Sequence, residues 1–422
     1  MTNIVRRLAA LAAVGGIAAS AGALLAQAPR TPPCARDNVG LTLPTGFCAM
    51  LVLDAAGPVR HIVVAPNGDV FGALRDGNLI AARDTTGDGR ADLVRRTHVG
   101  ETGSGIALAG GYLYYATDEA VVRWAWRTGQ LEPSGPPDTV VSRMVAGGEH
   151  SAKSIAVTAG GQLFVNIGAP SNSCQTEDRA RNVPGRDPCM LLDSAGGIWV
   201  FDAHRLHQRQ ADGRRWATGL RNVVSLSLDP SGAPWGVMHG RDQLADNWPQ
   251  YFDVRQSAEL PAEELFRIED GGDYGWPYCF YDPMQHKKVL APEYGGDGRQ
   301  VGRCATKGQP LLAFPAHWAP DGTLFYTLTQ FPEKYRGGLF IAFHGSWNRA
   351  PLPQEGYNVV FAPFAGGRPA GTYEVFADGF RGGSARAGSR PTGLALGPDG
   401  SLYVSDDRGG RVYRIIYAGT GR

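Results

Sequence analysis

Glu149 and His150 form a pair whose types and position suit proton chemistry. They stand in Gly147-Gly-Glu-His-Ser-Ala-Lys-Ser, directly before the apolar run Ile155-Ala-Val, so we expect them on a loop at the head of a β-strand. Histidine is the usual general base near neutral pH. The sequence therefore makes His150 a candidate base with an acidic neighbour, and the alternative is an ordinary surface histidine.

Three arginines from separate parts of the chain lie beside predicted strand ends. Arg221, followed by Asn222, and Arg390 each precede an apolar run, and Arg349 follows one. A planar guanidinium beside an amide suits carboxylate or quinone oxygens. Because no matching acids accompany them, the arginines favour an anionic ligand with several carboxylates or phosphates. The alternative for Arg221 is a structural pair with a neighbouring aspartate.

Two segments could hold a hard cation such as calcium. The polar turn Met238-His-Gly-Arg-Asp can direct the main-chain carbonyls of Gly240 and Arg241 toward a ligand, and carbonyl oxygens are good calcium donors. The second segment places Asp84, Asp88 and Asp92 around two glycines. Its spacing differs from that of an EF-hand, so a plain aspartate-rich turn is an equal alternative.

The elements that must position these residues recur along the chain. A turn followed by alternating apolar residues occurs at 66–71, 109–115, 159–165, 229–235, 320–326 and 398–404. Each copy predicts a hairpin, and a turn with two strands is about half of a four-stranded blade. We expect an all-β, six-bladed β-propeller that forms a single domain over residues 34–418, with long cysteine-bearing loops. A pair of β-sandwiches is the alternative.

The composition agrees with such a fold and restricts the partners. The 58 glycines and 29 prolines among 422 residues fit many tight turns, and a hydrophobic content of 43% can bury a large core. The net charge of +1 gives no field that would favour nucleic acid.

The N-terminus and the cysteines both indicate export. Arg6 and Arg7 precede an apolar run that ends in Ala26-Gln-Ala, which predicts a signal peptide over residues 1–28 and a periplasmic or secreted protein. An uncleaved membrane anchor is the alternative. The six cysteines fall in three sequence-local pairs, which favours three disulfides over free thiols although fifteen pairings are possible. These residues are Cys34, Cys48, Cys174, Cys189, Cys279 and Cys304.

Four further motifs, together with those above, give the chain a family resemblance. They are Gly168-Ala-Pro-Ser-Asn-Ser-Cys, Tyr274-Gly-Trp-Pro-Tyr-Cys, Ala316-His-Trp-Ala-Pro and His344-Gly-Ser-Trp-Asn-Arg. In their order and spacing, from about Leu43 to Ile415, they resemble the soluble quinoprotein glucose dehydrogenases and sorbosone dehydrogenases. The sorbosone branch is the more similar one.

The resemblance implies a dehydrogenase of sugars or sugar aldehydes that holds pyrroloquinoline quinone (PQQ) and calcium at the top of the propeller channel. It implies His150 as the base, Glu149 next to the substrate, and the carbonyls of Gly240 and Arg241 as calcium ligands. The implied cofactor contacts are Arg221, Asn222, Arg349, Arg390 and Lys153. An external quinone or cytochrome would accept the electrons. The cysteine-bearing loops would reshape the substrate cleft, so glucose is not assumed.

Two other functions compete with this interpretation. A calcium-dependent lactonase on a similar propeller would need several carboxylates converging on one metal. A non-enzymatic propeller that binds a carbohydrate or a protein would leave His150 and Arg221 without a catalytic role. Only the dehydrogenase should gain dye-reducing activity with PQQ and calcium.

Overall fold

The structure is a computed structural model that describes residue 2, residues 34–383 and residues 387–419. The predicted signal peptide, apart from residue 2, lies outside the described residues. Within these ranges no helix has the length and apolar character needed to cross a membrane.

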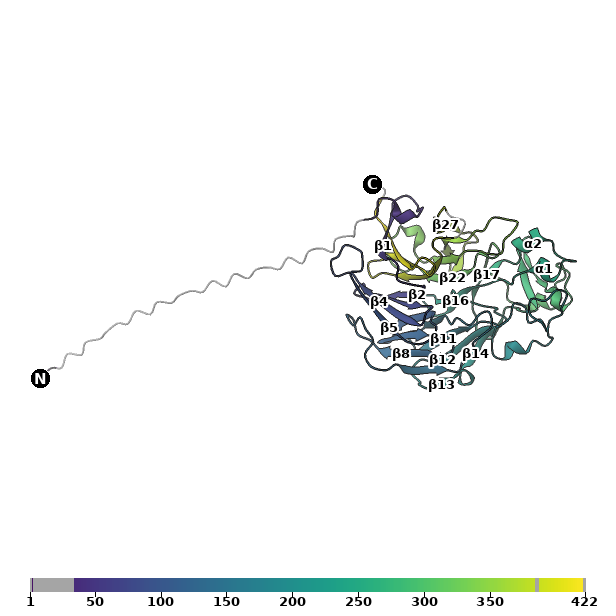
Figure 1. Ribbon diagram of the computed structural model, residues 1–422, viewed down its shortest axis with the longest axis horizontal. Helices are drawn as coiled ribbons and strands as arrows, with labels where there is room; N and C mark the ends of the chain where they lie inside the picture. Colours follow the sequence, from purple (N-terminus) through teal and green to yellow (C-terminus); the bar gives the residue numbers. More distant parts are fainter. Residues whose placement is uncertain (1, 3–33, 384–386, 420–422) are drawn as a thin grey trace. The chain divides into compact units, whose positions relative to one another are not determined.

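Six sheets follow one another along the chain, and their strands are antiparallel except for one short parallel strand in each of blades 2 and 3 (Figure 1). Blade 1 consists of β2 (Val59–Val64), β3 (Val70–Leu74), β4 (Asn78–Arg83) and β5 (Leu93–His98). Blade 2 consists of β6 (Gly105–Ala109), β7 (Tyr112–Ala116), β8 (Val121–Ala125), β9 (Asp138–Ser142) and the short parallel strand β13 (Gln208–Arg209). Blade 3 consists of β10 (Ile155–Val157), β11 (Gln162–Ile167), β12 (Gly197–Asp202), β14 (Arg214–Thr218) and β18 (Gly272–Asp273).

The second half of the chain supplies the other three blades. Blade 4 consists of β15 (Ser227–Leu228), β16 (Pro234–Met238), β17 (Glu263–Arg267) and β21 (Leu312–Phe314). Blade 5 consists of β22 (Pro320–Phe325), β23 (Leu339–His344), β24 (Tyr357–Ala362) and β27 (Glu374–Ala377). Blade 6 consists of β28 (Pro391–Leu396), β29 (Leu402–Asp406), β30 (Arg411–Tyr417) and β1 (Phe47–Leu53). The hairpins β19 (Cys279–Asp282)–β20 (Lys287–Leu290) and β25 (Phe364–Ala365)–β26 (Arg368–Pro369), and the helices α1 (Leu244–Asn247) and α2 (Val254–Glu259), lie in the connections.

The first strand closes the propeller. β1 pairs antiparallel with β30, with Phe47 opposite Tyr417, so the N-terminal strand completes the last blade (Figure 1). The first strands of successive blades contact one another in a ring, β2–β6–β10–β15–β22–β28 and back to β2. The predicted six-bladed β-propeller is therefore confirmed.

Five of the six turn motifs connect the first two strands of a blade, as predicted, but the motif at 320–326 does not. It forms the innermost strand β22, and residues 326–338 make the connection to β23 instead. A Cβ atom at Gly322 would lie 2.3 Å from the main-chain oxygen of Thr392, so this glycine serves close packing of β22 against blade 6. The register shifts between Pro320 and Gly322, and the shift falls at Asp321, which is buried.

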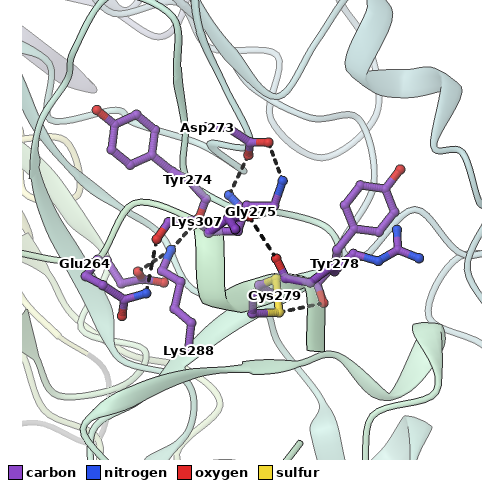
Figure 2. Close-up of a disulfide and its surroundings, with 12 residues drawn as sticks. Glu264, Asp273, Tyr274, Gly275, Tyr278, Cys279, Lys288 and Lys307 are labelled. Carbon is purple, nitrogen blue, oxygen red and sulfur yellow. Dashed lines mark hydrogen bonds and ion pairs between the residues drawn. A yellow bond between two sulfur atoms is a disulfide. The ribbon is translucent and has the colours of Figure 1, made fainter. Parts of the chain in front are cut away.

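Three local disulfides join Cys34 to Cys48, Cys174 to Cys189 and Cys279 to Cys304, which confirms the sequence-local pairing. Figure 2 shows the surroundings of Cys279, where Lys288 reaches Glu264 of β17 at 2.9 Å and also the main-chain oxygen of Tyr274. Both side chains of this ion pair are buried. The pair therefore attaches the β19–β20 hairpin to blade 4.

Replacing Cys174 and Cys189 with alanines should lower the free energy of unfolding by about 3 kcal/mol. Without the crosslink, the unfolded chain regains the conformational entropy that a closed loop of this length removes. Urea unfolding measures the change. The Cys34–Cys48 pair spans 14 residues against 15, so its removal is a matched control with a similar expected loss. An unchanged unfolding midpoint in the Cys174–Cys189 variant would contradict this prediction.

Candidate functional site

One end of the propeller collects most of the predicted site residues. In an antiparallel blade the start of the first strand and the end of the second strand lie at the same edge. The loops before β10, β15 and β28 and the loops after β16 and β23 therefore meet at one face. They carry His150, Arg221, Asn222, Gly240, His344, Arg349 and Arg390.

His150 is held as a free base. Its Nδ1 lies 2.5 Å from the main-chain oxygen of Ala169, and because a carbonyl oxygen only accepts, Nδ1 carries the proton. Nε2 then presents its lone pair, 4.0 Å from Glu149 Oε2. Burial, followed by the charge of Arg221, holds the pKa of His150 well below its usual range. The ring is thus neutral, and its Nε2 is ready to accept a proton.

Glu149 is bound by an arginine that the sequence analysis missed. Arg179 donates to both carboxylate oxygens of Glu149, at 2.8 Å for Oε2, and also to Asp242 at 3.0 Å and Gln243 at 2.5 Å. Arg179 lies on the loop closed by the Cys174–Cys189 disulfide, and nothing in that aperiodic segment indicates a site residue. The disulfide loop therefore contributes directly to the candidate site.

Asp242 is the acid at the centre of this cluster and was also missed, although it follows the predicted calcium ligands directly. Its carboxylate accepts from Arg179, from Arg221 at 3.2 Å and from Asn348 at 2.7 Å, and lies 3.5 Å from His317 Nδ1. Burial alone would raise the pKa of Asp242, but the contact with His317 and the charge of Arg221 hold it well below its usual range. Asp242 is therefore ionised and balances the cations around it.

Arg221 is buried, and its donors are almost fully used by the protein. It donates to the main-chain oxygen of Asn172 at 3.1 Å, to the side-chain oxygen of Asn172 at 3.0 Å, to Asp242 and to the main-chain oxygen of Gly240 at 2.8 Å. Of its five N–H groups, one on Nη1 has no acceptor among the described residues. Arg221 thus supports the Gly240 turn and keeps one donor for a ligand.

The two carbonyl groups of the Gly240–Arg241 turn differ in their hydrogen bonding. The Gly240 oxygen is shared with Arg221, whereas no donor within the described ranges bonds the Arg241 oxygen. The Arg241 side chain points elsewhere, since it is buried and pairs with Glu293 at 2.5 Å. The turn therefore offers carbonyl oxygens of the kind that calcium prefers.

Asn222 and His150 both pack closely around Gly168, which has no side chain. A Cβ atom at Gly168 would lie 2.6 Å from His150 Cβ and 2.8 Å from Asn222 Oδ1. The side-chain oxygen of Asn222 accepts from Asn166 at 2.8 Å, which fixes the orientation of the amide. Gly168 is thus needed for the close approach of two predicted site residues.

Lys153 belongs to a different set of charges. Its ammonium is buried, donates to the main-chain oxygen of Ser151 at 2.5 Å, and has Asp118 and Arg75 as its nearest charged partners. Burial lowers the pKa of Lys153 to about 8. The structure therefore does not place Lys153 among the charged neighbours of His150.

A polar pocket between blades 5 and 6 surrounds Arg390. Its volume is about 560 Å³, within the range of small-ligand sites. Its lining includes His344, Ser346, Trp347, Tyr357, Arg390 and Arg408. Within the described part of the chain the guanidinium groups of Arg390 and Arg408 form no ion pair within 4 Å, although both main-chain N–H groups donate to Asp406, and Trp347 is 64% exposed. We call this the Arg390 pocket; it offers the guanidinium groups of Arg390 and Arg408 beside an accessible aromatic ring, and its wall also contains the carboxylate of Asp407.

Arg349 is engaged outside the Arg390 pocket. Its guanidinium donates to the main-chain oxygens of Ala316 at 2.9 Å and Pro353 at 3.2 Å, and pairs with Glu355 at 3.3 Å. Only 7% of Arg349 is exposed. In this arrangement it braces the loop after β23.

The aspartate-rich turn uses its carboxylates internally. Asp84 accepts from the main-chain N–H groups of Gly87 and Gly89, each at 2.7 Å, and Asp92 accepts from Thr85 at 2.9 Å. Across residues 34–383 and 387–419 no three His, Cys, Asp or Glu side chains gather into a metal-binding group. The donor set that a lactonase would need is thus not found in the described residues.

A larger cavity of about 1000 Å³ lies at the other end of the strands, between blades 4 and 5. Its lining includes the β15–β16 turn at Asp229 and the β25–β26 hairpin at Gly366. None of its lining residues is among the site residues predicted from the sequence.

The profile of the TrAA12-like family matches residues 41–418, nearly the whole described propeller. The chain belongs to the TrAA12-like family. A PQQ-dependent pyranose dehydrogenase of Coprinopsis cinerea is 29% identical to this TrAA12-like chain over 261 residues, which are 52% of the chain and 34% of the relative. The chain spans between a third and a half of the length of the curated relatives that it matches.

Solved structures share the fold of this TrAA12-like protein. The holo form of the PQQ domain of the Coprinopsis cinerea pyranose dehydrogenase has a TM-score of 0.73 at 20% identity, covering 89% of this chain and 97% of that domain. The calcium structure of the Trichoderma reesei family AA12 enzyme also has a TM-score of 0.73, at 19% identity, covering 93% and 99%. These likenesses establish a common architecture. They do not single out the sorbosone branch, which stays a prediction.

Proposed function

We propose that this chain is an exported PQQ-dependent dehydrogenase of a sugar or sugar aldehyde, with His150 as its base. The observation that carries the proposal is the unprotonated Nε2 of His150, which lies on the same face as the Arg390 pocket. Family membership and the PQQ-dependent pyranose dehydrogenase relative support it. The three disulfides support export.

The Arg390 pocket fits the chemistry of PQQ, a flat aromatic molecule with three carboxylates. Arg390 and Arg408 would bind carboxylates and Trp347 would contact the ring. Arg221 and Asn222 would bind the quinone side, and the carbonyls of Gly240 and Arg241 would hold calcium. PQQ, when bound, would supply the hydride acceptor for the substrate carbon, and calcium would supply a Lewis acid for the accepting carbonyl.

The protein's own part in the reaction is to orient the substrate and take its proton. His150 Nε2 would accept the hydroxyl proton, and the Nδ1 hydrogen bond to Ala169 keeps the ring in the tautomer that can do so. Glu149, fixed by Arg179, would accept a hydrogen bond from a second substrate hydroxyl. An external quinone or cytochrome would then take the electrons. Lys153 and Arg349 remain proposed cofactor contacts that would require a rearrangement of their present bonds.

The test begins with PQQ and calcium added to the purified protein, followed by dye reduction over a panel of aldoses and sorbosone.

Arg390→Met should weaken PQQ binding, measured by calorimetry, at least about tenfold, because one charge-assisted contact is lost. Arg95→Met, which removes an exposed charge from the outer strand β5, is the matched control and should bind normally. A wild-type protein that neither binds PQQ nor reduces the dye would overturn the proposed function.

A further inference from the structure

A chain of part-buried polar contacts runs along the wall of the Arg390 pocket. Arg390 Nη1 lies 3.1 Å from His344 Nδ1, and His344 Nε2 lies 2.7 Å from Asp407 Oδ1. The other oxygen of Asp407 accepts from Arg60 Nη1 at 2.7 Å, and the same nitrogen lies 3.1 Å from Asp321. The contacts thus join strands of blades 1, 5 and 6.

The partners of His344 determine where its proton lies. A guanidinium has only donors, so the Nδ1 atom that faces Arg390 must accept. A carboxylate that is ionised only accepts, so the Nε2 atom that faces Asp407 must donate. These contacts place a proton on Nε2 and leave Nδ1 as the acceptor for Arg390.

Arg60 keeps Asp407 in the state that this arrangement needs. Burial alone would raise the pKa of Asp407, but the charge of Arg60 and its hydrogen bond to Oδ2 act to lower it. The carboxylate is thus available as an acceptor at neutral pH. Asp321 also pairs with Arg60, at 3.1 Å from the same Nη1 atom, so two carboxylates share one guanidinium.

We propose that His344 is a positioning residue, which aims Arg390 into its pocket by accepting from it, and that Asp407 selects the tautomer required. The acceptor matters because Arg390 has few other constraints: Nη2 bonds the main-chain oxygen of Ser346 at 3.3 Å, and the guanidinium lies 5.3 Å from the centre of the Tyr357 ring. The identity of the ligand rests on the proposed function, but the tautomer and the Arg390 contact do not.

The first test reads the tautomer directly, without cofactor. In protein labelled with ¹⁵N-histidine, the ring nitrogen shifts of His344, assigned by comparison with His344→Asn, should show an unprotonated Nδ1 and a protonated Nε2 at neutral pH. A ring protonated on Nδ1, or on both nitrogens, would overturn the inference.

The second test separates the two hydrogen bonds of His344 by side-chain shape. The amide of asparagine can place its oxygen where Nδ1 lies, whereas the longer glutamine places its amide near Nε2. Calorimetry with PQQ should therefore give His344→Asn an affinity close to that of the wild type. His344→Gln should bind about tenfold more weakly, the effect of one lost charged hydrogen bond.

Equal losses in both variants, or no loss in either, would contradict a positioning role, provided that thermal unfolding shows both to be folded. The two tests keep the inference distinct from the proposed function. If the wild type does not bind PQQ, the proposed function fails, while the nitrogen shifts still decide whether His344 accepts from Arg390.

Discussion

His150→Ala should lower kcat/KM for PQQ-dependent sugar oxidation about a thousandfold, the typical contribution of a positioned general base. The variant removes the imidazole whose Nε2 would take the hydroxyl proton, and leaves Glu149 in place. It leaves the Arg390 pocket intact, so calorimetry should find PQQ affinity within a few-fold of the wild type. His204→Ala, which alters an exposed histidine after β12, is the matched control and should keep full activity.

The pH profile gives an independent check on the same residue. Because the pKa of His150 is lowered, its base form persists as the pH falls, so the acid limb of kcat/KM should lie below the ordinary histidine value of about 6.5. Stopped-flow dye reduction between neutral and acidic pH measures this limb. A limb at or above the ordinary value, or an active His150→Ala variant, would remove His150 from the mechanism.

The fold could be predicted from sequence because its signals are local and repeated. Tight turns between alternating apolar residues define hairpins wherever they occur, and the number of hairpins defines the number of blades. The prediction of a turn at 320–326 was wrong because Gly322 allows close packing against Thr392 in blade 6. The residues around Gly322 do not indicate a partner so far away in the sequence. Local patterns therefore identify turns but do not distinguish a turn glycine from a packing glycine.

The site was predictable only in part, for a related reason. His150, Arg221 and Asn222 could be placed because each precedes a recognisable strand, and strand starts meet at one face. Arg179 lies on an aperiodic loop whose path is set by the Cys174–Cys189 disulfide, so no strand pattern locates it. Asp242 differs again: its position was visible, but its role depends on contacts from four other loops.

Arg349 and Arg390 show the same limit for charge. Both were predicted as unpaired cations from the absence of acids nearby in sequence. The guanidinium of Arg390 forms no ion pair within 4 Å among the described residues, whereas that of Arg349 donates to carbonyls and pairs with Glu355. A guanidinium can be neutralised by main-chain oxygens, which carry no sequence signature, so counting acids cannot tell a ligand-binding arginine from a bracing one.

Asp242→Asn should lower the free energy of unfolding at neutral pH by about 3–5 kcal/mol, the usual cost of removing one partner from a buried ion pair. Asparagine nearly preserves the shape, but it removes the charge that balances Arg179, Arg221 and His317. The side chain of Arg221 is only 4% exposed, so water cannot solvate the guanidinium after its carboxylate partner is removed. Urea unfolding measures the loss, and Asp246→Asn, at an exposed position of α1, is the matched control.

The acid dependence of stability distinguishes this charge effect from a packing defect. The folded pKa of Asp242 is lowered, so its stabilising contribution is complete above the unfolded carboxyl pKa of about 4 and is lost as the pH falls through the lower folded value. The wild type should therefore lose stability in acid more steeply than Asp242→Asn, and the two unfolding curves should converge. A constant difference at every pH would mean that asparagine disturbs packing, and equal stability at neutral pH would mean that Asp242 does not balance the cluster. Convergence would instead show that Asp242 stabilises the fold through its charge. The same carboxylate contacts Arg221 and Arg179 in the candidate site, so the charges that form the site also stabilise the fold.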